Sequence, residues 1–197
     1  MLGLTPCTYN SRMHYRIDNG WFGPARRVVS PNCDDRPQGS PIDLLVVHGI
    51  SLPPREYGGP WIDALFTNTL DPAAHPYFQS IRDARVSAHL LIRRDGEIVQ
   101  YVPFDRRAWH AGASCFEDRE ACNDFSIGIE LEGCDDEPYT GIQYQRLAAV
   151  AALLMKHYPG INRNRIVGHS DIAPGRKSDP GHVFDWNRLY TLLDKAS

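Results

Sequence analysis

Three residues of this chain carry side chains that bind first-row metal ions well: His48, His169 and Asp179. Each histidine ends a run of apolar residues, and Asp179 lies in the Gly- and Pro-rich segment 168–181. The ten positions between His169 and Asp179 are too many for one helix face, so we expect this segment to fold back on itself. Two imidazoles and one carboxylate with a fourth position left open are typical of catalytic zinc.

Two further residues have chemistry that such a site uses. Lys177 lies in the same segment, and a cation beside a metal site is a candidate for stabilising negative charge that develops during a reaction. Glu130 lies in the alternating segment 126–132, on the same face as Gly128, which leaves open space there. The more ordinary interpretation of this segment is a half-exposed strand whose two carboxylates, Glu130 and Glu132, are solvated.

Each metal-ligand candidate also has a structural interpretation. A lone His48 after a buried strand is more often a hydrogen-bonded core histidine. A loop from His169 to Asp179 is more often a hydrogen-bonded turn than a metal site. A structural zinc site would use four closed ligands, usually including cysteine, and no cysteine lies near either histidine in the sequence. If zinc binds here, the catalytic pattern fits better than the structural one.

The length and composition predict one ordinary globular domain. The chain has 197 residues, of which 42% are hydrophobic and 23% are charged, enough apolar material for a sizeable core. We expect an N-terminal extension at residues 1–15 and a single domain at residues 16–197. The net charge of -3 and the pI near 6.2 give no electrostatic argument for a nucleic-acid or membrane partner.

The cysteines and the N-terminal segment predict a reducing, cytoplasmic environment. Residues 1–20 lack the apolar core of a signal peptide, and no run approaches the about 18–20 apolar residues of a membrane helix. An odd number of cysteines without regular spacing does not form a disulfide framework. We therefore expect free thiols at all five positions: Cys7, Cys33, Cys115, Cys122 and Cys134.

The apolar patterning predicts an α/β fold with a mixed central β-sheet flanked by helices. The strongest strand is 43–50, which reads as a central strand buried on both faces. The other expected strands are a hairpin with an Asp-Gly turn (86–92 and 97–102), 126–132 and 165–169. The expected helices are 60–66, 186–193 and 140–157, in which Thr140 and Gln143 can form a capping box.

These motifs together resemble the zinc-dependent N-acetylmuramoyl-L-alanine amidases of the type-2 amidase fold, which peptidoglycan-recognition proteins share. Within that family the chain is most similar to the AmpD-type anhydro-N-acetylmuramyl-L-alanine amidases. The resemblance runs from about Trp21 to about Leu193. The segments that carry it are LLVVH at 44–48, ISLPP at 50–54, GGPWIDALF at 58–66, HPYF at 75–78, VSAH at 86–89, RRDGEIVQYVPF at 93–104, RAWHAG at 107–112, CNDFSIGIELEG at 122–133 and the segment 168–181.

The resemblance implies both an activity and a set of site residues. The reaction is hydrolysis of the amide between the lactyl group of (anhydro-)N-acetylmuramic acid and L-alanine in small muropeptides, by a monomer in cytoplasmic peptidoglycan recycling. The implied zinc ligands are His48, His169 and Asp179. Glu130 is implied as the general base and acid and Lys177 as the group that stabilises the oxyanion, whereas the implied substrate-binding residues are Arg85, Trp109 and His110.

Two positions depart from the family pattern, and two other functions compete with the amidase. Related enzymes often carry Asn directly after the first zinc histidine, where this chain has Gly49, and some carry Arg where it has Ala121. Both departures bear on substrate specificity and not on the class of reaction. The first competing function is a non-catalytic peptidoglycan-recognition module, which typically lacks a zinc ligand. The second is a structural-zinc interaction protein, which would leave Glu130 and Lys177 unexplained.

Overall fold

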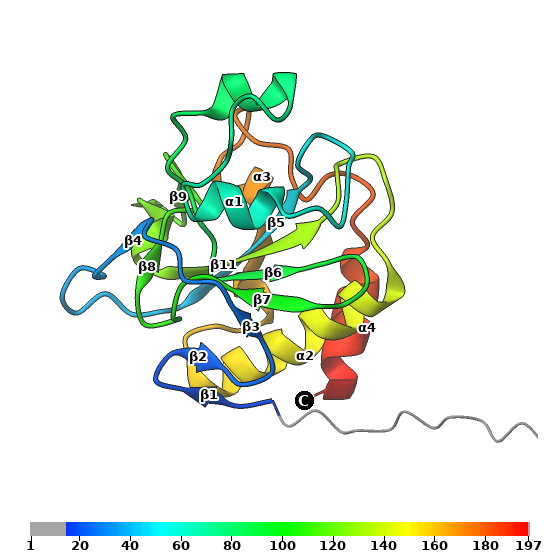
Figure 1. Ribbon diagram of the computed structural model, residues 1–197. Coiled ribbons are helices and arrows are strands. Elements are labelled where there is room, and N and C mark those ends of the chain that lie inside the picture. Colours follow the sequence, from blue (N-terminus) through cyan, green and yellow to red (C-terminus); the bar gives the residue numbers. More distant parts are fainter. Residues whose placement is uncertain (1–14, 197) are drawn as a thin grey trace, which may run out of the picture.

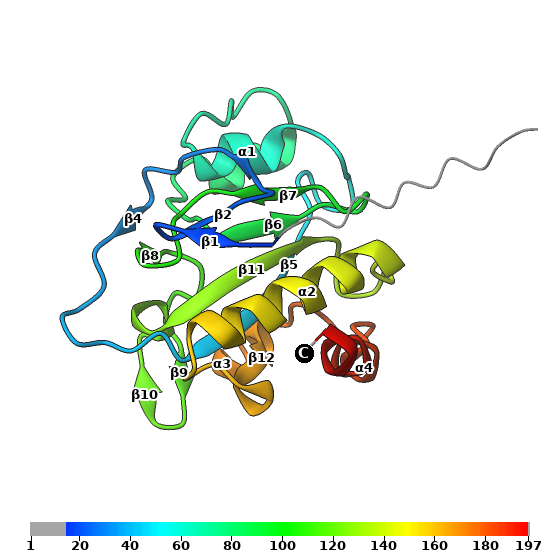
Figure 2. The same ribbon diagram turned by 90° about the horizontal axis from the view of Figure 1, so that it is seen from below.

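A mixed six-stranded β-sheet runs through the part of the chain that the structure, a computed structural model, describes, residues 15–196. Its strands follow the order β12–β5–β11–β6–β7–β3; Figure 1 labels the strands from β5 to β3, and β12 is labelled in Figure 2. The four strands from β12 to β6 are parallel, β7 is antiparallel to β6, and β3 is parallel to β7. Their bounds are Ile166–Gly168 (β12), Leu44–Ile50 (β5), Ser126–Glu132 (β11), Leu90–Ile92 (β6), Ile98–Gln100 (β7) and Arg26–Arg27 (β3). The predicted mixed α/β sheet is confirmed.

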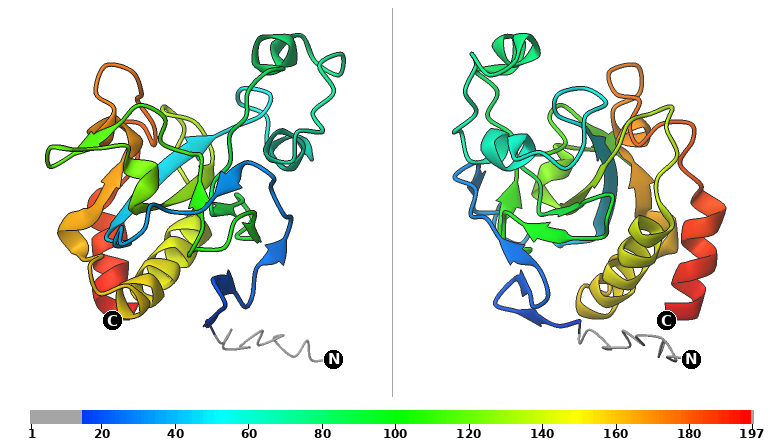
Figure 3. Two further views of the ribbon diagram at one scale, coloured as in Figure 1. Left: turned by 90° about the vertical axis from the view of Figure 1, so that its left-hand side faces the viewer. Right: turned by 45° about the vertical axis from the view of Figure 1, so that its right-hand side comes forward.

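Helices cover both faces of this sheet. Two long helices, α2 (Gly141–His157) and α4 (Trp186–Ala196), lie together along one face (Figure 2). The short helix α1 (Trp61–Phe66) and the 3₁₀ helix η1 (Pro76–Ile81) stand on the other side (Figure 3). The four-residue helix α3 (His169–Ile172) follows directly after β12. The remaining 3₁₀ turns of the described residues are η2 (Cys122–Asp124) and η3 (Arg163–Arg165).

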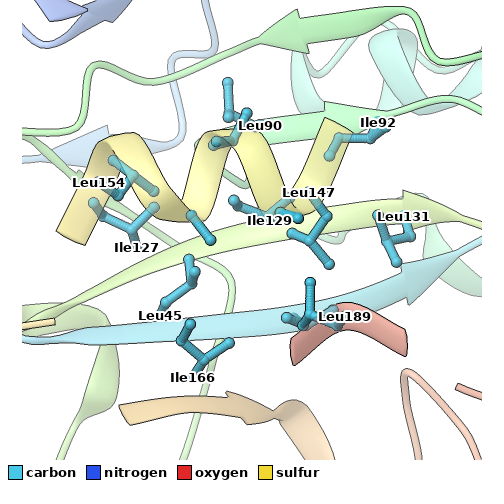
Figure 4. Close-up of a cluster of buried hydrophobic side chains, with 14 of the residues drawn as sticks. Leu45, Leu90, Ile92, Ile127, Ile129, Leu131, Leu147, Leu154, Ile166 and Leu189 are labelled. Carbon is cyan, nitrogen blue, oxygen red and sulfur yellow. The ribbon is translucent and has the colours of Figure 1, made fainter. Parts of the chain in front are cut away.

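The main hydrophobic core lies between the sheet and the pair α2 and α4. Alternate residues of the central strands point into it, and leucines at helical spacing on α2 and α4 meet them (Figure 4). Burying one such leucine or isoleucine stabilises the fold by about 1.5–3 kcal/mol. The residues at its centre are fully or almost fully buried: Leu45, Leu90, Ile92, Ile127, Ile129, Leu131, Leu147, Leu154, Ile166 and Leu189.

The start of α2 agrees with its sequence pattern. The Thr140 hydroxyl accepts a hydrogen bond from the backbone of Gln143, and the Gln143 side chain accepts one from the backbone of Thr140. This reciprocal pair is the predicted capping box. The Gln143 amide also donates to the carbonyl oxygens of Ile92 and Glu132, so the cap ties the helix to the sheet.

The alternating sequence of β11 favours a half-exposed strand, but all seven of its residues are buried in the structure. Glu132 is not solvated. It forms an ion pair with the buried Arg93 at 3.1 Å and also accepts hydrogen bonds from the backbone of Gly58 and Arg94. The space beside Gly128 is not open either, since a Cβ there would lie 2.4 Å from the His110 ring. Loops far away in the sequence therefore cover the polar face of this strand.

Short antiparallel strand pairs border the sheet. They are β1 (Ile17–Asp18) with β2 (Trp21–Phe22), β4 (Cys33–Asp34) with β8 (Arg107–Ala108), and β9 (Cys115–Phe116) with β10 (Arg119–Glu120). Residues 1–14 of the predicted extension lie outside the described residues. Tyr15, which that prediction also included, stacks on Phe22 with ring centroids 5.2 Å apart and accepts a hydrogen bond from Arg146.

Four of the five cysteines lie within the described residues, and all four are free thiols. Cys7 falls outside that part of the chain. We expect peptide mapping of freshly purified protein under non-reducing conditions to find no intramolecular bridge. Cys115 and Cys122, which are seven positions apart, are the most informative pair. A bridged peptide from that pair would contradict the expectation.

No helix among residues 15–196 is long and apolar enough to cross a membrane.

Candidate metal centre and active-site cleft

The candidate site lies where three neighbouring parallel strands end. Gly168 of β12 pairs with Val47 of β5, so the next residues along the two chains, His169 and His48, lie side by side. Glu130 of β11 pairs directly with His48 on the other side of β5. Ligands and reacting groups commonly gather at the carboxyl ends of parallel strands. The sheet register therefore brings these three side chains to one edge.

Asp179 completes the group because the segment after β12 folds back, as its sequence predicts. That segment is not loop throughout, since it begins with helix α3, whose first residue is His169. The Asp171 carboxylate accepts a hydrogen bond from Gly168 at 2.7 Å and holds the start of the turn. The backbone N–H of Ser170 then donates to the carbonyl oxygen of Asp179 at 3.0 Å. Two contacts close to His169 thus hold the returning chain.

The three predicted ligands face one another through one atom each. His48 Nδ1 and His169 Nδ1 are 2.9 Å apart, and Asp179 Oδ2 lies 3.3 Å from the first and 3.1 Å from the second. Two ligand atoms held about 2.0–2.1 Å from a tetrahedral zinc ion lie about 3.3 Å apart. The donor set and the size of this triangle therefore fit zinc. Within residues 15–196, these three side chains are the group of His, Cys, Asp or Glu residues that lie close enough together to hold a metal ion.

The surroundings of His48 and Asp179 shift their pKa values toward the protonation states that a metal needs. Burial lowers the pKa of His48 to about 4, although the nearby Asp179 carboxylate opposes this shift. Burial alone would raise the pKa of Asp179, but its close contacts with the His169 and His48 rings outweigh burial and lower that pKa below its ordinary value. A neutral imidazole and an ionised carboxylate are the forms that coordinate a metal.

Glu130 is buried beside this triangle without being part of it. Its Oε2 atom has no hydrogen-bond partner among the described residues. Burial raises the pKa of Glu130 well above its ordinary value, the Asp179 charge adds to the rise, and Lys177 opposes it. A carboxyl group with a raised pKa can both accept and return a proton near neutral pH.

A cleft of about 770 Å³ opens over the triangle and brings most of the predicted site residues together. A volume in this range is typical of small-molecule sites. Lys177 is exposed at its wall. The predicted residues that line it are Glu130, Lys177, His169, Asp179, Trp109 and His110.

The predicted substrate-binding residues Arg85 and His110 lie in different settings. Arg85 does not line this cleft. It is exposed at a smaller adjoining depression of about 200 Å³, and its guanidinium donates to the carbonyl oxygen of Ala84 at 3.0 Å. His110 lies at the bottom of the main cleft and is 8% exposed, with its Nδ1 2.9 Å from Nε2 of His48. His110 thus contacts a metal-ligand candidate directly.

Comparison with known proteins identifies the family. Residues 38–182 match the profile of the N-acetylmuramoyl-L-alanine amidase family, which covers well over half of the chain. The chain belongs to this family. The predicted recognition and the type-2 amidase fold are therefore confirmed.

The relatives within the family are close in both sequence and structure. The 1,6-anhydro-N-acetylmuramyl-L-alanine amidase AmpD of Citrobacter freundii is 63% identical over 181 residues, which cover 92% of this chain and 96% of that protein. A crystal structure of a selenomethionine derivative of AmpD has a TM-score of 0.88 at 63% identity and covers 90% of this chain and 99% of its own. The amidase AmiD of Escherichia coli, in complex with anhydro-N-acetylmuramic acid-L-Ala-D-γ-Glu-L-Lys, has a TM-score of 0.57 at 30% identity. The match covers 80% of this chain and 60% of the AmiD chain.

The two departures from the amidase pattern have different structural settings. A Cβ at Gly49 would lie 2.3 Å from the hydroxyl of Tyr139, which itself donates to the carbonyl oxygen of Pro180. A side chain at position 49 would therefore fit only if Tyr139 moved. Ala121 has a left-handed backbone (φ 57°) and lines a separate depression near Cys115, not the main cleft.

Sequence reasoning passed over two polar residues behind the cleft, Asn123 and Ser126. Asn123 Oδ1 accepts hydrogen bonds from the backbone of His110 and Ala111, and Ser126 contacts the His110 ring. An asparagine in a turn and a serine beginning a strand are too common to attract notice by type. Only their contacts in the folded chain distinguish them.

Proposed function

We propose that this chain is a zinc-dependent amidase that hydrolyses the amide between the lactyl group of anhydro-N-acetylmuramic acid and L-alanine in muropeptides. One observation carries the proposal: the triangle of His48, His169 and Asp179 at the bottom of the cleft, with the unpaired carboxyl group of Glu130 beside it. Zinc bound there would polarise the scissile carbonyl and make water a nucleophile near neutral pH.

Glu130 is the proposed proton carrier. Its carboxylate takes a proton from the attacking water as the new carbon–oxygen bond forms, and then gives that proton to the alanine nitrogen as the carbon–nitrogen bond breaks. The products are the lactyl carboxylate and the free amino group of the peptide. The burial of Glu130, its raised pKa and its orphan Oε2 atom support this role.

Lys177 is the proposed group for the developing negative charge. It lies two residues from Asp179, it is exposed at the cleft wall, and it has no ion pair among the described residues that would neutralise it. Its ammonium group can stabilise the carbonyl oxygen while that oxygen carries charge in the tetrahedral state. Trp109 and His110, which also line the cleft, are proposed to form part of its substrate wall.

The proposed substrate is a small anhydro-muropeptide released during peptidoglycan turnover. The AmpD relatives are named for this anhydro sugar, and the AmiD structure holds an anhydro-muramyl tripeptide. The proposed setting is cytoplasmic recycling, as the AmpD-type resemblance implies, and the proposed form of the enzyme is a monomer.

The competing function is a recognition module that holds muropeptide without cutting it. The complete His, His and Asp set favours the enzyme, because such a module has no need of a third metal ligand. We expect mass spectrometry of zinc-loaded protein mixed with anhydro-muropeptide to detect free peptide, and a chelator to stop its release. Unchanged muropeptide that stays bound to the protein would support the recognition module instead.

A further inference from the structure

Each histidine of the proposed metal triangle has a second ring nitrogen that faces the protein, and those two nitrogens meet consecutive residues of one loop. His48 Nε2 lies 2.9 Å from Nδ1 of His110. His169 Nε2 lies 3.2 Å from the carbonyl oxygen of Ala111. A neutral imidazole carries one N–H, so the partner of one nitrogen decides whether the other is free to bind a metal.

The hydrogen bonds around His110 fix the direction of the first contact. The Ser126 hydroxyl lies 2.5 Å from the carbonyl oxygen of Cys122, which can only accept, so this hydroxyl donates there. Its oxygen therefore accepts from His110 Nε2, 3.1 Å away. His110 then has a bare Nδ1, which accepts the N–H of His48 Nε2. Because the one N–H of the neutral His48 ring is then at Nε2, its Nδ1, which faces Asp179, has no proton.

The contact between His169 and Ala111 determines the tautomer of His169 directly. The Ala111 carbonyl oxygen can only accept, so His169 Nε2 carries the proton and His169 Nδ1 is bare. The Arg176 guanidinium donates to this carbonyl oxygen at 2.6 Å. It also lies 3.5 Å from His169 Nε2, which is longer than the 3.2 Å between that nitrogen and the Ala111 oxygen. Both histidines thus present an unprotonated Nδ1 to the centre of the triangle.

The loop that makes both contacts is held from behind. Asn123 Oδ1 accepts the backbone N–H groups of His110 and Ala111 at 3.1 and 2.8 Å. The His110 ring lies against Gly128, where a Cβ would come within 2.4 Å of its Cγ. A larger residue at position 128 would displace the ring. Packing between strand β11 and His48 therefore holds the His110 ring in one position.

We propose that the dipeptide His110–Ala111 is a positioning element that sets the tautomer of both metal-binding histidines, with Ser126 and Asn123 as its anchors. The inference rests on the proposed metal site, and it gives His110 a role in holding that site besides its place in the cleft wall. Groups that orient metal-bound histidines typically change metal affinity by about 10–100-fold when they are removed.

The first test reads the tautomers directly and needs neither metal nor substrate. Long-range ¹H–¹⁵N correlation spectra of the metal-free protein at neutral pH distinguish protonated from bare ring nitrogens. We expect the Nε2–H form for His48, His110 and His169. A protonated Nδ1 on any of the three would overturn the proposal.

The second test measures zinc affinity by competition with a chromophoric chelator. The His110→Leu variant removes the acceptor, and its zinc dissociation constant is expected to rise about 10–100-fold. The His110→Asn variant retains most of the wild-type affinity, because its amide oxygen replaces Nδ1 as acceptor. Equal affinities for the Leu variant and the wild type, or an equal loss in both variants, would contradict the positioning role.

A matched control separates this effect from general loss of stability. Gln143 is another buried polar residue whose side chain makes several hydrogen bonds, but it lies at the start of α2 and contacts no ligand candidate. The Gln143→Leu variant should lose stability in the metal-free state and keep its zinc affinity. An equal loss of zinc in this control would overturn the proposal. Wild-type protein that binds no zinc would instead refute the proposed metal site, and the tautomer spectra would still decide the inference.

Discussion

The Glu130→Gln variant is expected to lose about 10²–10⁴-fold in turnover of anhydro-muropeptide while it keeps its zinc. Glutamine preserves the shape of the side chain but cannot take up the proton of the attacking water. Glu130 is not one of the three ligand candidates, so the metal should remain. Single-turnover hydrolysis measured together with bound zinc tests both halves of this prediction. Substrate affinity should change little, because the loss falls on the transition state.

The matched control is Glu132→Gln, on the same strand and also buried. Glu132 pairs with Arg93 and accepts two backbone hydrogen bonds, so its variant should lose about 2–3 kcal/mol of unfolding free energy and keep its rate while folded. Glu130, with its orphan Oε2 atom, should show the opposite result, a lost rate without lost stability. A Glu130→Gln variant that stays active, or that loses its zinc, would refute the proposed role.

The second large effect is expected from the ligands themselves. The His48→Ala and Asp179→Ala variants should each fall from about one zinc per chain to a small fraction of that, because each loses one of three protein ligands. Hydrolysis should disappear with the metal. Elemental analysis of purified protein, followed by an activity assay with and without added zinc, measures both.

The exposed His157 in the last turn of α2 provides the control, since the His157→Ala variant removes an imidazole far from the triangle in the fold. Its zinc content and rate should match the wild type. Full zinc occupancy in either ligand variant would overturn the ligand assignment.

The sequence by itself determined the local elements and the candidates for the chemistry. Four consecutive apolar residues before His48 predicted the central strand β5, and Thr140 with Gln143 predicted the start of α2. These features depend on neighbours a few positions away, so composition and period reveal them. The family resemblance also named His48, His169 and Asp179, and these three come together in the fold.

Only the tertiary structure decided what covers each face. Alternation placed Gly128, Glu130 and Glu132 on one side of β11. It did not show that His110 fills the space beside Gly128 or that Arg93 neutralises Glu132. The family resemblance likewise named Arg85 for substrate binding, and only the structure shows that this residue lies at an adjoining depression. The physical reason is that a strand's period defines which way a side chain points, whereas the groups it meets come from segments tens of residues away, and only the packed chain brings them there.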